Sequence, residues 1–263
     1  MGWPGRIAAI GAVIAAGSLA SCALLSASER PDPAPQPSVP AASTAPAPTV
    51  TPSPASPPVR TSWLTGLPEP SPRPLLIVKL DNTRNAQPHA GLRDADVVYI
   101  EEVEYGITRI AAVFSSKIPE RIGPVRSARI TDIDLLAQYG SPAFAFSGAQ
   151  HKLWPALADA SFIDISPNKG AQNYARDYDR RAPYNYFLNG PGGLKRAPDA
   201  STTTDMGWVF GEDPPPGGLP VTKARMEWSY ASASFTYDEP LGSYKVHLNG
   251  IKAQAEEDGT VQH

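Results

Sequence analysis

Hydrophobic and polar residues alternate in blocks along residues 63–160, and the blocks predict both strands and helices. The apolar run at 75–80 (LLIVKL) is short and continuous, which is typical of a strand buried on both faces. Residues 97–103 and 108–115 are rich in β-branched residues and flank Gly106, so they predict a β-hairpin. We also expect a strand at 143–146, and helices at 127–139, ended by Gly140, and at 149–160, interrupted near Pro155.

A second group of strands follows the Gly- and Pro-rich stretch 211–220 (GEDPPPGGLP), which marks an internal boundary. The order of the elements predicts an α+β fold, with a mixed α/β domain at 63–212 and a smaller β-rich domain at 219–263. The polar ending at 256–259 shows no closing element, so we expect the second domain to be incomplete. Its strands are expected at 221–228, 234–237 and 244–248.

Residues 1–22 have the pattern of an export signal. Arg6 precedes an apolar run, residues 7–19, that is shorter than the roughly 20 residues needed to span a bilayer. The sequence Leu19-Ala20-Ser21-Cys22 is similar to the bacterial lipobox, whose cysteine receives a diacylglyceryl group. We therefore expect a protein that is anchored through lipidated Cys22 to the outer face of the bacterial cytoplasmic membrane. The simpler alternative is an unmodified cysteine in a plain membrane anchor.

Residues 23–62 consist mostly of Pro, Ala, Ser and Thr with four charged residues. Such a segment cannot bury enough apolar area to offset its ordering entropy, so it predicts a disordered tether. Prolines favour an extended chain at ~3.1 Å per residue, which gives a reach on the order of 100 Å.

Composition narrows the classes of function. The net charge of -3 argues against a nucleic-acid binder, and a single cysteine excludes a disulfide framework or a Cys-rich metal site. The four histidines are widely separated, and neither a P-loop nor a dinucleotide-binding motif occurs. We therefore expect neither a metal nor a cofactor.

The segment 121–129 (RIGPVRSAR) is the most unusual local feature. Arg121, Arg126 and Arg129 surround a Gly-Pro turn, and Ser127 begins the expected helix. A helix N-terminus and planar guanidinium groups both favour carboxylate or phosphate, so the segment predicts an anion-binding site. The alternative is that these arginines pair with acidic residues of the same protein.

A second candidate site is polar or catalytic and contains Asp81, Asn82, Glu101 and Arg109. Asp81 ends a buried strand, and the spacing Glu101-Glu102-x-Glu104 places two of these glutamates on one strand face. Paired carboxylates serve in acid–base catalysis, although solvated or ion-paired carboxylates are more common. The tyrosine- and charge-rich segment 176–186 suits either a sugar surface or an ion-paired loop, and Ser147 and His151 lack the G-x-S-x-G elbow of α/β-hydrolases.

Four motifs resemble the YerB-type lipoprotein family, whose domain of unknown function is designated DUF3048. The resemblance spans about 70–250 and implies a bacterial surface lipoprotein with a second, smaller and β-rich domain, without implying an activity. Residues 181–185 (RAPYN) also resemble the family, with Tyr184 where a histidine is common, and family members look longer at the C-terminus. The four motifs are VKLDN (78–82), ADVVY (95–99), GITR (106–109) and IGPVRSAR (122–129).

Three functions follow from these patterns. The first is a lipid-anchored binding module that holds an anionic wall polymer or an acidic segment of an envelope protein. The second is an envelope hydrolase or transferase that uses Asp81 or Glu101 with the arginines as oxyanion stabilisers. The third is a scaffold for another membrane protein.

Overall fold

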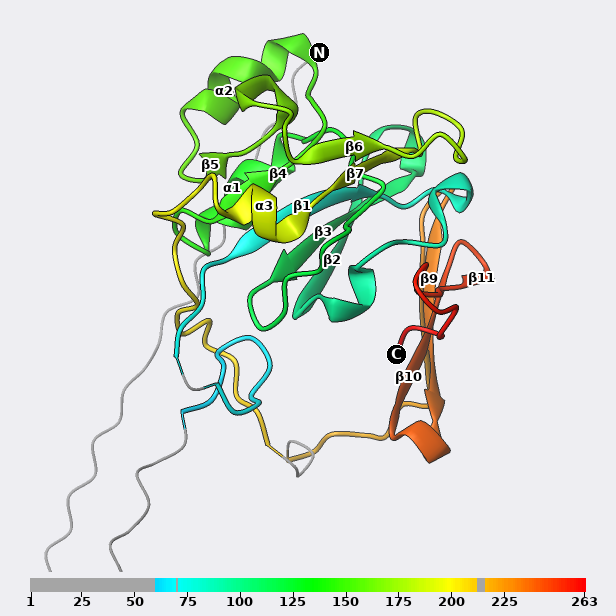
Figure 1. Ribbon diagram of the computed structural model, residues 1–263. Helices are drawn as coiled ribbons and strands as arrows, with labels where there is room; N and C mark the ends of the chain where they lie inside the picture. Colours follow the sequence, from blue (N-terminus) through cyan, green and yellow to red (C-terminus); the bar gives the residue numbers. More distant parts are fainter. Residues whose placement is uncertain (1–59, 70, 212–215) are drawn as a thin grey trace, which may run out of the picture. The chain divides into compact units, whose positions relative to one another are not determined.

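A five-stranded mixed sheet forms the centre of the fold (Figure 1), with the strand order β2-β3-β1-β4-β5. The computed structural model describes residues 60–69, 71–211 and 216–263, so Cys22, the export signal and the tether before residue 60 lie outside the described residues. Strand β3 pairs antiparallel with β1 and β2, whereas β4 pairs parallel with β1 and β5. The strands are β1 (Leu76–Asp81), β2 (Val97–Glu102), β3 (Thr108–Phe114), β4 (Ala143–Ala145) and β5 (Ile163–Asp164).

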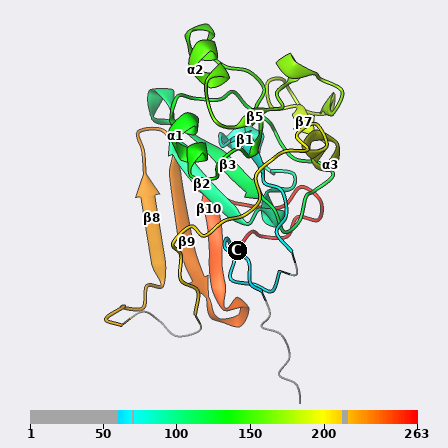
Figure 2. The same cartoon turned by 90° about the vertical axis from the view of Figure 1, so that its left-hand side faces the viewer.

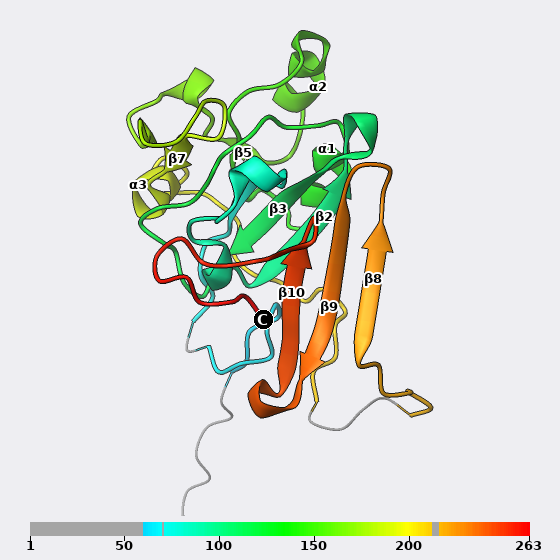
Figure 3. The same cartoon turned by 90° about the vertical axis from the view of Figure 1, so that its right-hand side faces the viewer.

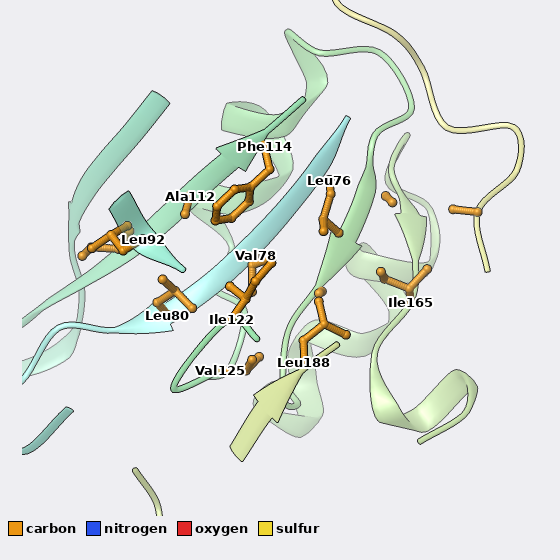
Figure 4. Packing of buried hydrophobic residues seen from close by; sticks show 14 of the residues in the cluster. Leu76, Val78, Leu80, Leu92, Ala112, Phe114, Ile122, Val125, Ile165 and Leu188 are labelled. Atoms are coloured by element: carbon orange, nitrogen blue, oxygen red, sulfur yellow. The ribbon is translucent and has the colours of Figure 1, made fainter. Parts of the chain in front are cut away.

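The expected hairpin and the expected buried strand are both confirmed. Every residue of β1 is buried, because its side chains alternate between two apolar cores on the two faces of the sheet. Leu76, Val78 and Leu80 point into the first core together with Phe114 and the loop residue Ile122 (Figure 4). The other face of the sheet packs against the helix α1 and the aromatic residues near β4.

The two expected helices exist but are shorter than the sequence pattern predicts. Helix α1 (Thr131–Ala137) begins after the arginine segment, because residues 122–128 are extended and bond the sheet instead. The Arg126 amide donates to the carbonyl of Lys79, and the Asp81 amide donates to the carbonyl of Pro124. Helix α2 (Trp154–Ala158) follows a 3-10 turn and carries Pro155 in its first turn.

Several short elements escaped prediction from the sequence, among them the two-residue strands β5 and β11 (Ile251–Lys252). Strands β6 (Tyr174–Arg176) and β7 (Tyr186–Leu188) form a two-stranded ribbon, and helix α3 (Gly190–Leu194) follows directly. A periodic pattern cannot be recognised in segments of three to five residues.

The C-terminal part forms an antiparallel sheet in the order β11-β10-β9-β8, in which β9 lies between β8 and β10 (Figures 2 and 3). The three expected strands are present, as β8 (Lys223–Glu227), β9 (Ser232–Asp238) and β10 (Ser243–Leu248), and β11 (Ile251–Lys252) follows. The polar ending does pair with the rest of this sheet. Gln254 bridges Val261, and the Val246 amide donates to the carbonyl of Gln262.

Hydrogen bonds join the C-terminal sheet to the loop after β1, and the folded region is one compact unit. The Asn249 amide donates to the carbonyl of Asn82, and Gln87 Nε2 donates to the carbonyl of Leu248 over 3.2 Å. At the other end of the folded region, Thr61 bridges Pro68, so the fold begins slightly before the expected end of the tether. The fold class is α+β, as the sequence predicts. No helix in the described ranges has the length and apolar character needed to cross a bilayer.

Candidate functional site

Strand register brings three charged residues into one row at the end of the first sheet. Arg109 of β3 lies opposite Asp81 of β1 on one side and opposite Glu101 of β2 on the other. Residues directly opposite each other in antiparallel strands project from the same face of a sheet. The sequence predicted Asp81, Glu101 and Arg109 as one polar site, and the structure places them side by side.

A buried lysine lies behind this row. The side chain of Lys79 is fully buried, and its Nζ donates to Glu101 Oε1 over 2.5 Å and to Asp132 Oδ1 over 2.7 Å. Burial raises the pKa of Asp132, while the charge of Lys79 opposes that shift. Thr131 also donates to Glu101 Oε2, so this triad fastens the start of α1 to the sheet.

The guanidinium groups of Arg126 and Arg129 lie close to that of Arg109 in this row. Arg126 Nε donates to Asp81 Oδ2 over 2.6 Å, and Arg129 Nε donates to Glu104 Oε2 over 2.8 Å. Arg109 Nη1 donates to the carbonyl of Ser127. Ser127 therefore contributes its backbone carbonyl to this site, and it does not begin a helix. We call Arg109, Arg126 and Arg129 the arginine cluster.

The arginine cluster carries positive charge that its neighbours do not fully balance. Burial lowers the pKa of Arg109 to about 10, and the charges of Arg129 and Arg126 add to this effect more than Asp81 and Glu104 oppose it. Arg109 remains protonated at neutral pH. Among the described residues, none bonds the two terminal nitrogens of Arg126, whose side chain is 26% exposed. These two nitrogens form a planar donor pair that fits a carboxylate or a phosphate.

The two candidate catalytic carboxylates are fully engaged in hydrogen bonds. Asp81 is 2% exposed, and its second oxygen accepts from both the amide and the hydroxyl of Thr83. Glu101 divides its two oxygens between Lys79 and Thr131. Asn82 points to a different neighbour, because its amide donates to the hydroxyl of Thr108.

Arg121 does not belong to this site, which corrects the grouping expected from the sequence. Its guanidinium pairs with Asp177 over 2.6 Å and with Glu256 over 2.9 Å, and it covers the ring of Phe187. Arg180 also bonds Glu256. The segment 176–186 and the acidic ending thus form ion pairs within the molecule. The physical reason for the separation is that an extended chain from 122 to 126 carries Arg121 away from Arg126.

The expected pairing of glutamates was also wrong. Glu102 is the last residue of β2, and its side chain lies on the opposite face from that of Glu101. Glu104 lies beyond the strand, so the alternation of side chains along a strand does not determine its position. Glu104 lies in the following 3-10 turn and bonds Arg129 and Gln150. Lys79 and Asp132 were not predicted as site residues from the sequence. The available signal for Lys79 was a charged residue inside a continuous apolar run.

Histidine and acidic residues elsewhere do not assemble into a metal site within the described part of the chain. His89 is fully buried, and burial lowers its pKa. Its Nε2 donates to the carbonyl of Asp81 over 2.7 Å, which fixes the loop that follows β1.

Comparisons with known proteins agree with this architecture. Residues 64–203 match the family model described as "Protein of unknown function (DUF3048) N-terminal domain". The chain is 47% identical over 57 residues to "Putative lipoprotein YerB" of Bacillus subtilis (strain 168), a match that covers 22% of this chain and 17% of that protein. The crystal structure of YerB from Bacillus subtilis superposes with a TM-score of 0.64 at 22% identity, covering 77% of this chain and 71% of the other.

The matched region contains β1 to β5, the buried triad and the arginine cluster. The structural likeness supports the fold, and the family model covers more than half of the chain. The chain therefore belongs to the DUF3048 family.

Proposed function

We propose that this protein is a lipid-anchored binding module of the bacterial cell envelope, and that the arginine cluster holds an anionic group of a wall polymer. The name of the Bacillus subtilis relative as a lipoprotein supports the anchor, as does the lipobox-like sequence that ends at Cys22. A thioether-linked lipid anchors a protein strongly, since each buried CH₂ contributes about 0.8 kcal/mol. The tether then carries the folded part away from the membrane.

The observation that carries the binding proposal is the donor pair of Arg126. Its Nε is held by Asp81, which fixes the plane of the guanidinium and leaves the terminal nitrogens for a ligand. Arg109 and Arg129 flank this pair and contribute positive charge. A bound carboxylate or phosphate relieves the repulsion among the three guanidinium groups.

The contacts of the carboxylates favour binding over hydrolysis. A general base needs a lone pair that can reach the substrate proton. Asp81 and Glu101 use both of their oxygens within the protein, so neither presents a free carboxylate oxygen to a substrate.

The test of the proposal compares Arg126→Lys with Arg121→Lys in co-sedimentation with purified cell walls. Lysine keeps the charge beside Asp81 but loses the planar donor pair. We expect Arg126→Lys to weaken binding about tenfold, since a charged hydrogen bond contributes about 1.5–3 kcal/mol. Arg121→Lys should bind like the wild type, because Arg121 lies in a separate ion-pair network. Equal binding by all three proteins contradicts the proposal.

Two further measurements complete this test. Thermal unfolding of both variants checks that the fold survives each substitution. Removing wall phosphate chemically, or blocking wall carboxylates, then shows which anion the cluster takes. Capture of an acidic protein segment in place of wall material would contradict the assignment to a polymer.

The anchor is tested separately by Cys22→Ser. We expect the variant to lose incorporation of labelled fatty acid and to leave the membrane fraction. Equal labelling of the variant and the wild type contradicts the lipidation proposal.

A further inference from the structure

A pocket lies near the arginine cluster, on the opposite face of the sheet. It has a volume of about 430 Å³ and opens where Asn82 and Thr108 meet the turn between β8 and β9. Thr108 immediately precedes Arg109 in β3, and successive side chains of a strand project to opposite faces. The pocket therefore lies on the other face of the sheet from the arginine cluster, and Thr83, which lines the pocket and bonds Asp81, links the two sites.

The lining of this pocket combines aromatic rings with planar polar groups. Trp228 and Tyr230 come from the end of β8 and the turn after it, and Tyr230 is 78% exposed. Arg225 and Glu227 lie on β8 and bond each other, and Arg84 follows β1. Arg225 and Glu227 balance each other and Arg84 adds one positive charge, so the pocket suits a ligand that is rich in hydroxyl groups and carries no positive charge.

Asn82 supplies an unused acceptor at this pocket. The residue is 1% exposed, and no described residue bonds its side-chain oxygen. Its amide nitrogen donates to Thr108, and its carbonyl accepts from Asn249, so the residue is firmly held. A buried acceptor without a partner costs about 1–3 kcal/mol, and a ligand hydroxyl can remove that cost.

The turn that carries Tyr230 is held in place before any ligand arrives. The Tyr230 amide donates to the carbonyl of Gly106 over 2.9 Å, and a Cβ at Gly106 would lie 2.6 Å from the Cβ of Ser229. Gly106 has a φ of +64°, so a side chain there is disfavoured for two reasons. The close approach of these two turns preorganises the pocket wall.

We propose that this pocket binds a neutral saccharide. The apolar C–H face of a sugar ring stacks on Tyr230, because the aromatic face is negative and the C–H groups are weakly positive. The hydroxyls of the ring donate to Asn82 Oδ1 and Glu227 and accept from Arg225. The volume lies in the range of pockets that hold small ligands.

The experiment titrates the full chain, purified in detergent, with tetrasaccharides of β-1,4-linked N-acetylglucosamine, of glucose and of mannose. Calorimetry measures the affinity, and tryptophan fluorescence reports on Trp228. We expect at least one of these sugars to bind, and we expect Tyr230→Ala to weaken that binding about tenfold. Glu227→Gln should also weaken it, through the loss of a charged acceptor.

Two control variants separate this proposal from other effects. Tyr178→Ala removes another highly exposed tyrosine, in the segment 176–186, and should bind the sugar normally. Arg126→Lys should also bind the sugar normally, so a failure of the anion-binding proposal would not change the outcome of this experiment. The proposal is overturned if the wild type binds none of the three sugars, or if Tyr230→Ala binds as tightly as Tyr178→Ala.

Discussion

Replacing Lys79 by methionine removes the cation from the buried triad with little change in side-chain length. Asp132 then keeps a carboxylate that is 0% exposed and has lost its cationic partner. Removing one member of a buried ion pair costs about 3–5 kcal/mol, against a total stability of about 5–15 kcal/mol for a folded domain. We expect Lys79→Met to lose about that amount at pH 7.

The loss should depend on pH with a defined sign. Burial raises the pKa of Asp132, and the charge of Lys79 opposes that rise in the wild type. Without Lys79, the native state of the variant holds the Asp132 proton more tightly than the unfolded chain does. The free energy of unfolding therefore falls as the pH rises above about 4, by up to about 1.4 kcal/mol per pH unit. The deficit should be small at pH 5 and large at pH 7.

Urea unfolding followed by circular dichroism at both pH values measures this difference. Adding Asp132→Asn to Lys79→Met should recover much of the loss, because it removes the buried charge. The matched control is Lys245→Met, since Lys245 is 39% exposed and pairs with Asp238. That variant should lose less than about 1 kcal/mol. A Lys79→Met deficit that is equal at both pH values and unchanged by Asp132→Asn would refute the reasoning.

Two further predictions concern the loops around the site. Burial lowers the pKa of His89, so on acidification the unfolded chain takes up the His89 proton at a higher pH than the folded protein does. The free energy of unfolding should therefore fall as the pH drops below about 6.5. His89→Gln should reduce this pH dependence, measured as unfolding free energies from pH 5 to 7. A Cβ at Gly123 would lie 2.5 Å from the ring of Phe187, so Gly123→Ala should cost about 1–3 kcal/mol and lower the melting temperature. Gly211→Ala, where no other described residue lies within 4 Å of a Cβ, should leave the melting temperature unchanged, and equal melting temperatures for both variants would contradict the packing argument.

Local sequence patterns were sufficient to predict a strand or helix where the segment has one dominant hydrophobic periodicity. The run 75–80 was recognisable because burial on both faces selects a continuous apolar strand, and the hairpin 97–115 because β-branched residues flank the turn at Gly106. The helices were recognised but placed too broadly. Their ends depend on which backbone groups find partners in the sheet, as the bonds from 122–128 show.

The candidate site was recognised in part, for a related reason. Asp81, Glu101 and Arg109 lie in one row because each is at or one residue from the end of its strand, and strand pairing aligns them. Arg121 was grouped with Arg126 from nearness in the sequence. In an extended segment, that nearness does not place two side chains in one site.

The sequence by itself determined the fold class, the strands of the central hairpin and the family, because each rests on patterns within a short stretch of chain. It also carries the lipobox-like signal and the tether composition, on which the proposed anchor rests. Only the tertiary structure decided that Lys79 meets Glu101 and Asp132, and that the acidic ending covers Arg121. These contacts join residues far apart in the chain, and the free energy that selects them depends on burial and on the distances between charges.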